Sequence, residues 1–204
     1  TTMSDGYKTI TQTSQGIYKA KMSKFISFAI PIDNEDDAKA TIKVYQNKYH
    51  DARHCCWAYM LGPNHDRFLC NDNGEPSGTA GRPILGQIRS FQLTNVLVCV
   101  VRYFGGIKLG TPGLIEAYKT AAFEALNSAT IVECREKRQI SFTFPYLSMQ
   151  GIMKIIKSSD VKLLSQDFDN SCSMTIECNL DDFEQLSAQL AKVDGCKITS
   201  GEQA

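Results

Sequence analysis

NVLVCVVRYF, residues 95–104, is a nearly unbroken run of apolar residues. Such a run predicts a strand that is buried at the centre of a sheet. The glycine-rich segment GGIKLGTPG follows it, and LIEAYKTAAFEAL (residues 114–126) has the spacing and the residue types of an amphipathic helix. We therefore expect a buried strand, a tight loop and a helix in succession.

Further elements are expected on the N-terminal side of this strand. A second glycine-rich stretch, NDNGEPSGTAGRPIL (residues 71–85), leads into a short helix with Pro83 in its first turn. The remaining segments predict a strand or bent pair over residues 16–32, a helix over 33–50 capped by Asp33 or Asn34, and a hairpin of strands 54–61 and 67–71.

The pattern breaks near residue 134 and then starts again. Strand, helix, two strands across a hairpin, a helix capped by Asp181 or Asp182, and a last strand follow in order. This β-α-β-β-α-β order is that of the ferredoxin-like split βαβ motif. We expect an α+β protein of two domains, residues 1–134 and residues 135–204.

Composition excludes several classes of protein. Of the 204 residues, 43% are apolar and 22% are charged, with a net charge of zero, as in an ordinary globular protein. No apolar run approaches the roughly 20 residues of a membrane span, and the polar N-terminus lacks a secretory apolar region. We expect a cytoplasmic protein without a membrane partner, in which the eight cysteines are reduced and mostly buried. Because no C-x-x-C pair occurs, no metal site is predicted.

The charges are unevenly distributed along the chain. No acid occurs from Pro76 to Ile115, a stretch that contains Arg82, Arg89, Arg102 and Lys108. These four side chains either form a local positive face or point in different directions.

Each glycine-rich loop lies between a strand and a helix, where the free amides of a helix N-terminus can hold an anion. The alternative is a plain tight turn. GGIKLGT is not a Walker A motif, because Thr111 stands where the lysine belongs, and neither loop matches G-x-G-x-x-G. No cofactor is therefore predicted.

Two acids in the first loop, Asp72 and Glu75, are either paired carboxylates or residues that cap the loop and pair with Arg82. Arg102 and Tyr103 end the buried strand beside Phe104. They suit stacking and phosphate contact, and Arg102 equally suits a bridge to Glu75 that locks the two loops together.

No catalytic group is predicted. The segment HDARH (residues 50–54) resembles a zinc-protease motif, but the helix is expected to end near His50 while His54 opens a strand. His54 and Cys55 point to opposite faces of that strand, which argues against a thiol nucleophile.

Both glycine-rich stretches, with SKFISFAIPI and HCCWAYML before them, resemble the signature of the Impact family, which includes bacterial YigZ-type proteins. Lys24, Phe25, His54 and Ala58 stand at the expected places, whereas Asn71 and Asn73 flank Asp72 where acids are often found. The match covers about residues 16–127.

The resemblance implies a fold like domain 2 of ribosomal protein S5 for the first domain. It implies a ferredoxin-like second domain similar to the last domain of elongation factor G. It also implies regulation of translation, the role of eukaryotic relatives. We expect a groove between the loops whose ligand- or phosphate-binding residues come from a set of eight: Lys24, His54, Asp72, Glu75, Arg82, Arg102, Tyr103 and Lys108.

The predicted function is that of a non-enzymatic binding protein whose partner is RNA, the ribosome or a translation-regulating protein. The alternative is an enzyme that acts on a phosphorylated small molecule or nucleotide at the same loops. Fold analogy does not decide between them.

Overall fold

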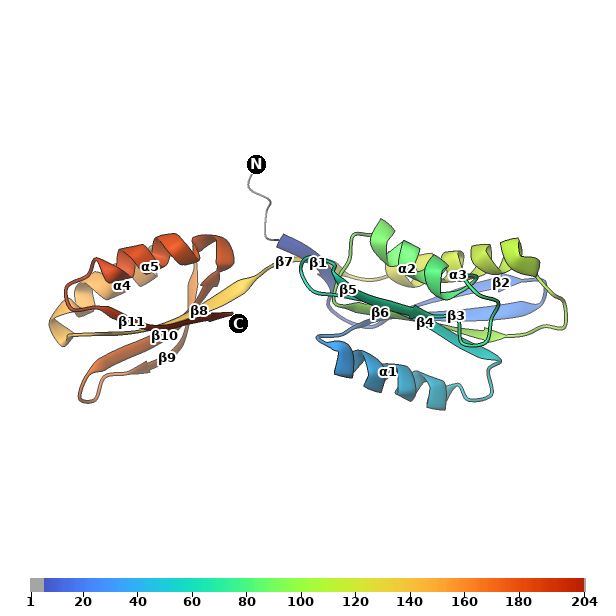
Figure 1. Cartoon of the computed structure of the whole chain (residues 1–204), viewed down its shortest axis with the longest axis horizontal. Coiled ribbons are helices and arrows are strands. Elements are labelled where there is room, and N and C mark those ends of the chain that lie inside the picture. Colours follow the sequence, from blue (N-terminus) through green and yellow to red (C-terminus); the bar gives the residue numbers. More distant parts are fainter. Residues whose placement is uncertain (1–5, 204) are drawn as a thin grey trace. The chain divides into compact units, whose positions relative to one another are not determined.

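A computed structural model describes residues 6–203 of the chain (Figure 1). Residues 1–5 and 204, which the predicted domains include, lie outside the described residues. The chain forms two compact units. One is Tyr7–Cys134, and the other runs from Arg135 toward the C-terminus and also includes Gly6.

A five-stranded antiparallel sheet forms the middle layer of the larger unit. Its order is β2-β3-β6-β4-β5. The strands are β2 (Ser14–Ala20), β3 (Ser23–Pro31), β4 (His54–Leu61), β5 (Arg67–Asn71) and β6 (Val96–Tyr103). The central position of β6 confirms the interpretation of the apolar run, since seven of its eight residues are buried.

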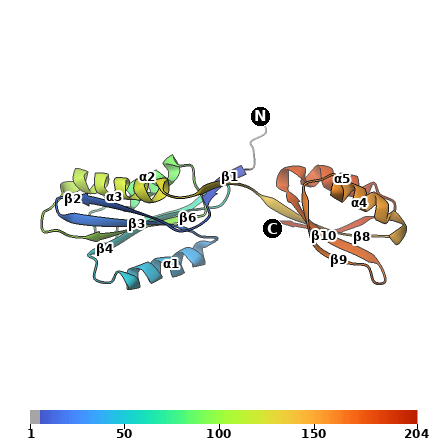
Figure 2. The same cartoon turned by 180° about the vertical axis from the view of Figure 1, so that it is seen from behind.

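Helices cover both faces of this sheet (Figures 1 and 2). Helices α2 (Gly81–Ser90) and α3 (Gly110–Asn127) lie on one face, and α1 (Glu35–Lys48) lies on the other. Two apolar cores result, one under α2 and α3 and one under α1. The side chain of Asn34 caps α1 by accepting a hydrogen bond from the Asp37 amide at 2.8 Å, as one of the two predicted caps.

A pair of short strands was not predicted. Strand β1 (Gly6–Ile10) pairs with β7 (Ile131–Arg135) to form a two-stranded sheet. Both segments are short and rich in polar residues, and their pairing joins positions more than 120 residues apart. Local periodicity does not reveal such a contact.

The smaller unit contains a four-stranded antiparallel sheet of order β11-β8-β10-β9. Its elements are β8 (Lys137–Phe144), the 3₁₀ turn η1 (Tyr146–Ser148), α4 (Met149–Lys157), β9 (Val161–Asp167), β10 (Cys172–Asn179), the 3₁₀ turn η2 (Leu180–Asp182), α5 (Phe183–Ala191) and β11 (Lys197–Gln203). The predicted β-α-β-β-α-β order is confirmed, and α4 and α5 lie on one face of the sheet (Figure 1). Asp182 is the N-cap residue of α5, although its side chain makes no capping hydrogen bond.

All eight cysteines are free thiols, and five of them are buried. Within residues 6–203, no helix is both long and apolar enough to cross a membrane.

Candidate functional site

A pocket of about 330 Å³ lies between the two glycine-rich loops of the larger unit. The residues that line it come from the ends of β4 and β6, from both loops and from the first turn of α3. They are Arg53, His54, Glu75, Pro76, Arg102, Phe104, Lys108, Leu109, Gly110, Thr111 and Leu114.

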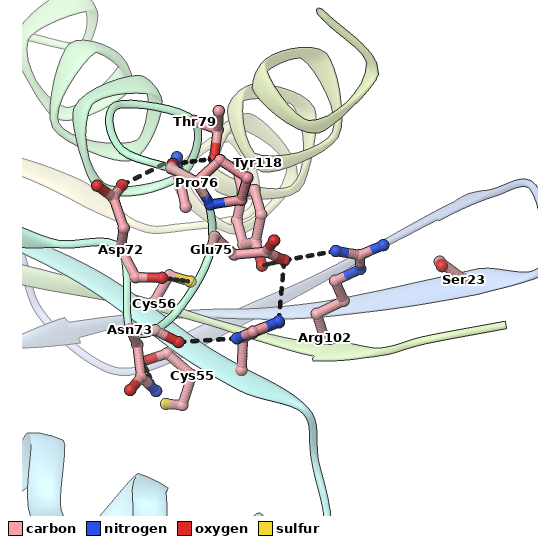
Figure 3. Close-up of polar contacts among 12 residues, drawn as sticks. Ser23, Cys55, Cys56, Asp72, Asn73, Glu75, Pro76, Thr79, Arg102 and Tyr118 are labelled. Carbon is pink, nitrogen blue, oxygen red and sulfur yellow. Dashed lines mark hydrogen bonds and ion pairs between the residues drawn. The ribbon is translucent and has the colours of Figure 1, made fainter. Parts of the chain in front are cut away.

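Glu75 is the hub of the polar contacts in this pocket (Figure 3). Its Oε1 accepts hydrogen bonds from Arg102 Nη1 at 2.6 Å and from the Tyr118 hydroxyl at 2.7 Å. The Glu75 side chain is only 3% exposed. A carboxylate can be buried in this way only when cations and hydrogen-bond donors surround it. The ion pair therefore ties the first glycine-rich loop to the end of β6, which was one of the two predicted roles of Arg102.

Strand register explains where the Arg102 side chain points. Arg102 lies opposite both Phe25 of β3 and His54 of β4, so the three side chains share the α2 and α3 face. The guanidinium carbon lies 5.5 Å from the centre of the Phe25 ring and 5.4 Å from that of Phe104. Arg102 is only 5% exposed, and yet its Nε has no hydrogen-bond partner among the described residues. One donor of a buried cation is thus unsatisfied.

His54 is held in one orientation by the first loop. Its Nδ1 lies 2.8 Å from the carbonyl oxygen of Asn73, which can only accept, so Nδ1 carries the hydrogen. Nε2 then points toward Glu75 Oε1 at 3.7 Å. Gly74 permits this approach, because its φ is +87° and a Cβ there would lie 3.2 Å from Nδ1.

Asp72 has a structural role behind the pocket. Its carboxylate accepts hydrogen bonds from the amides of Gly78, Ala80 and Gly81 at 2.8–3.1 Å. Burial by itself raises the pKa of Asp72, but these amides hold that pKa below its ordinary value. The amides at the start of α2 are consequently occupied by the chain's own carboxylate, and the first glycine-rich loop is a capped turn.

The start of α3 differs from that of α2. Within the described residues, no side chain caps α3, whose N-cap is Leu109, and its first turn contains no acid. The amides of Gly110 and Thr111 therefore lack intrahelical acceptors, and Pro112 has no amide hydrogen, whereas the amide of Gly113 is positioned to bond to the carbonyl of the N-cap residue Leu109. Since the lining of the pocket holds three basic side chains and one carboxylate, its formal charge is +2 with His54 neutral. This end of the pocket suits an anion.

Two weak acids below the pocket act as hydrogen-bond donors. Burial raises the pKa of the Cys56 thiol well above its ordinary value, and the thiol donates to the Asp72 carbonyl at 3.0 Å. Burial, with the nearby Cys56 and Glu75, likewise raises the pKa of Tyr118. Both groups remain protonated at neutral pH, so neither is activated as a nucleophile.

The structure brings together only half of the predicted site residues. His54, Glu75, Arg102 and Lys108 line the pocket. Lys24 and Tyr103 do not, because they lie opposite one another in strands β3 and β6, one residue from Phe25 and Arg102, and so face the α1 side. The Tyr103 hydroxyl donates to Asp51 at 3.0 Å.

Arg82 also lies elsewhere, on α2 in a separate hollow with Arg89. Of the described ion pairs, both involve Glu75 and neither involves Arg82. The predicted pairing of Arg82 with the loop acids is therefore not found, although Arg82 contributes to lowering the pKa of Asp72. The four cations of the acid-free stretch therefore divide into two pairs, with Arg102 and Lys108 in the pocket and Arg82 and Arg89 in the other hollow.

Sequence reasoning missed three residues of this site. Tyr118 could have been found, because it lies one turn beyond Leu114 on the apolar face of the predicted helix. A tyrosine hydroxyl that is buried on such a face needs a hydrogen-bond partner. Thr111 was noted only for its mismatch to a phosphate-binding motif. Arg53 gave no signal, since it stands in a turn between a helix and a strand.

Comparisons with known proteins find relatives of this chain in sequence and in structure. The Impact N-terminal domain model matches residues 21–126. YigZ of Escherichia coli K12, an IMPACT family member, is 30% identical over 86% of this chain and 87% of its own length. YvyE of Bacillus subtilis 168, another member, is 34% identical over 79% of this chain and 74% of its own.

A solved structure is also similar. The crystal structure of a hypothetical protein matches with a TM-score of 0.72 and 26% identity, over 96% of this chain and 97% of that chain. The chain therefore belongs to the Impact family, as its motifs predicted.

Proposed function

We propose that this protein is a non-enzymatic binding protein linked to translation, and that its pocket holds a phosphate group of RNA, free or within the ribosome. One observation carries the proposal. Arg102 lines the pocket and its buried Nε has no partner among the described residues, and the uncapped start of α3 lines the same pocket.

A phosphate group matches the donors that the pocket offers. Its oxygens accept charge-assisted hydrogen bonds from a guanidinium, from backbone amides and from a lysine. Arg102 Nε is buried in the unliganded chain, so a phosphate oxygen bonds it only after the side chain shifts, and then satisfies a donor that otherwise costs on the order of 1–3 kcal/mol to leave unpaired. Arg53 stacks on Phe104, with its guanidinium carbon 5.0 Å from the ring centre. This pair forms an exposed surface of the kind on which nucleobases stack.

The architecture of the two units supports a link to translation. We infer a fold like domain 2 of ribosomal protein S5 for residues 1–134, and a ferredoxin-like fold similar to the last domain of elongation factor G for residues 135–204. The β-α-β-β-α-β order of the second unit is consistent with this. Cytoplasmic localisation follows from the proposed role.

A second candidate is an enzyme that acts on a phosphorylated small molecule or nucleotide. The volume of the pocket favours it, since about 330 Å³ lies at the lower end of small-molecule sites, which span roughly 300–1,000 Å³. Thermal stabilisation by a nucleotide or a phosphorylated metabolite, in the absence of RNA binding, would support this candidate.

Sedimentation with ribosomes and with total RNA, over a series of salt concentrations, tests the proposal. We expect binding that falls steeply with salt and is weakened by Lys108→Ala and by Arg53→Ala. Lys119→Ala is the matched control, because Lys119 is exposed on α3 and does not line the pocket. Absence of binding at low salt, or equal losses in all three variants, would contradict the proposal.

A further inference from the structure

A second hollow, of about 350 Å³, lies in the larger unit between strand β5 and helix α2. It shares no lining residue with the phosphate pocket. Phe68, Leu69, Cys70, Arg82, Leu85 and Arg89 line it, and we call it the β5–α2 groove.

Strand β5 lies at the edge of the five-stranded sheet. It pairs through Arg67–Asn71 with β4 on one side only, so the backbone donors and acceptors on its other side have no strand partner within the described residues. An extended peptide can add to such an edge by main-chain hydrogen bonds.

Two large apolar side chains of β5 remain exposed at this edge. Phe68 is 48% exposed and Leu69 is 50% exposed, which is unusual for neighbouring large apolar residues of a strand. Phe68 lies opposite Met60, a core residue under α2, and therefore faces the helix. Leu69 lies opposite Tyr59 and faces the α1 side. An added strand would thus find one apolar contact on each face.

Two arginines on α2 provide the charge of the groove. Arg82 and Arg89 are two helical turns apart, and among residues 6–203 no carboxylate forms an ion pair with either. The guanidinium carbon of Arg89 lies 4.6 Å from the centre of the Phe68 ring. Stacking of this kind holds the guanidinium in place and leaves its edge free to bind a carboxylate with two hydrogen bonds.

The geometry restricts the ligand further. Arg82 and Arg89 are separated by roughly 10 Å along the helix, and side chains on one face of a strand repeat about every 7 Å. Carboxylates two residues apart on an added strand can therefore reach Arg89, which is held by Phe68, and the long side chain of Arg82. Gly86 lies between the arginines, and a Cβ built on it would meet nothing within 4 Å, so this part of α2 is open.

We propose that the β5–α2 groove binds an extended acidic segment of a partner protein, which adds as a sixth strand beside β5 and places alternate carboxylates on Arg82 and Arg89. RNA fits these features less well, because it has no amide hydrogens or carbonyl groups along its backbone to pair with a strand edge.

Two blocked peptides of alternating residues test the proposal, one of valine and glutamate and one of valine and lysine. Binding is measured by fluorescence anisotropy with the full chain. We expect the glutamate peptide to bind and the lysine peptide not to bind. The double variant Arg82→Gln with Arg89→Gln should weaken glutamate-peptide binding at least tenfold, whereas Lys119→Gln should leave it unchanged. Both arginines are exposed, and circular dichroism verifies that the variants remain folded.

A third peptide separates strand addition from simple charge attraction. Methylation of alternate backbone nitrogens of the glutamate peptide removes amide donors while the charge is retained, and we expect at least a tenfold loss of affinity. The proposal would be overturned if the methylated peptide bound as tightly as the glutamate peptide, or if the glutamate peptide did not bind. It would also be overturned if the double variant lost RNA binding but kept its affinity for the peptide.

Discussion

Glu75 connects both sides of the pocket through one of its two carboxylate oxygens. This oxygen, Oε1, accepts hydrogen bonds from Arg102 and Tyr118 and also faces His54. In Glu75→Gln the buried guanidinium of Arg102 loses its counter-charge, and removal of one partner of a buried ion pair costs about 3 kcal/mol or more. We expect a loss of this size in the free energy of unfolding, measured by urea denaturation. Glu124→Gln, on the exposed face of α3, serves as the control. A loss below about 1 kcal/mol would show that the ion pair is not essential to the fold.

Asp72 makes the stability of the larger unit depend on pH. Because its pKa is lowered in the folded protein, its stabilising effect is complete above its pKa in the unfolded chain and is lost as pH falls through the lowered folded value. We expect Asp72→Asn to be less stable than the parent chain near neutral pH, with a difference that shrinks toward about pH 3. Urea midpoints at several pH values measure this. A difference that stays constant with pH would mean that the charge of Asp72 has no part in capping α2.

The sequence indicates which residues need a partner better than it indicates which partner each of them contacts. The Arg102–Glu75 bridge was one of two open interpretations, since a buried strand that ends in arginine needs a counter-charge. Lys24 was placed in the groove because of the resemblance to the Impact family, and Tyr103 because it adjoins a glycine-rich loop in sequence. Which face they occupy depends on the register between β3 and β6, which no local pattern specifies.

Two glycines test how closely the elements of the larger unit pack. A Cβ on Gly16 of β2 would lie 2.5 Å from the backbone nitrogen of Ala125 in α3, so Gly16→Ala must separate the helix from the sheet. Gly86 of α2 has open space around it, and alanine is a better helix former by about 0.5–1 kcal/mol. We expect Gly16→Ala to lower the thermal midpoint and Gly86→Ala to raise it. A neutral Gly16→Ala would contradict the close contact of α3 with β2.

Elements with strong local signals were predictable. The apolar run of β6, the hairpin of β4 and β5 and the periodic face of α3 were each read correctly, because burial imposes a pattern on contiguous residues. Strands β1 and β7 were missed because their stability depends on a partner distant in sequence. Both glycine-rich loops were predicted to precede a helix N-terminus that could hold an anion, and the hydrogen bonds of Asp72 show that the start of α2 is capped while that of α3 is open.

Each compact unit of the chain has an apolar core of its own. The core of the smaller unit is built by residues from β8, α4, β10 and α5, including Ile140, Phe142, Ile152, Ile176 and Leu190. We therefore expect residues 135–204 alone to fold cooperatively, with a sigmoidal thermal transition followed by circular dichroism. A transition without cooperativity would show that this core is insufficient in isolation.

The central claim concerns a phosphate of RNA at Arg102 Nε and the start of α3. Titration of the ¹⁵N-labelled chain with a short 5′-phosphorylated RNA, followed by NMR, reports on these donors directly. We predict that the largest chemical-shift changes occur at the Arg102 Nε–H resonance and at the amides of Gly110 and Thr111, and that they are reduced in Lys108→Ala. RNA binding that leaves these resonances unchanged, or a titration without any change, would contradict the account.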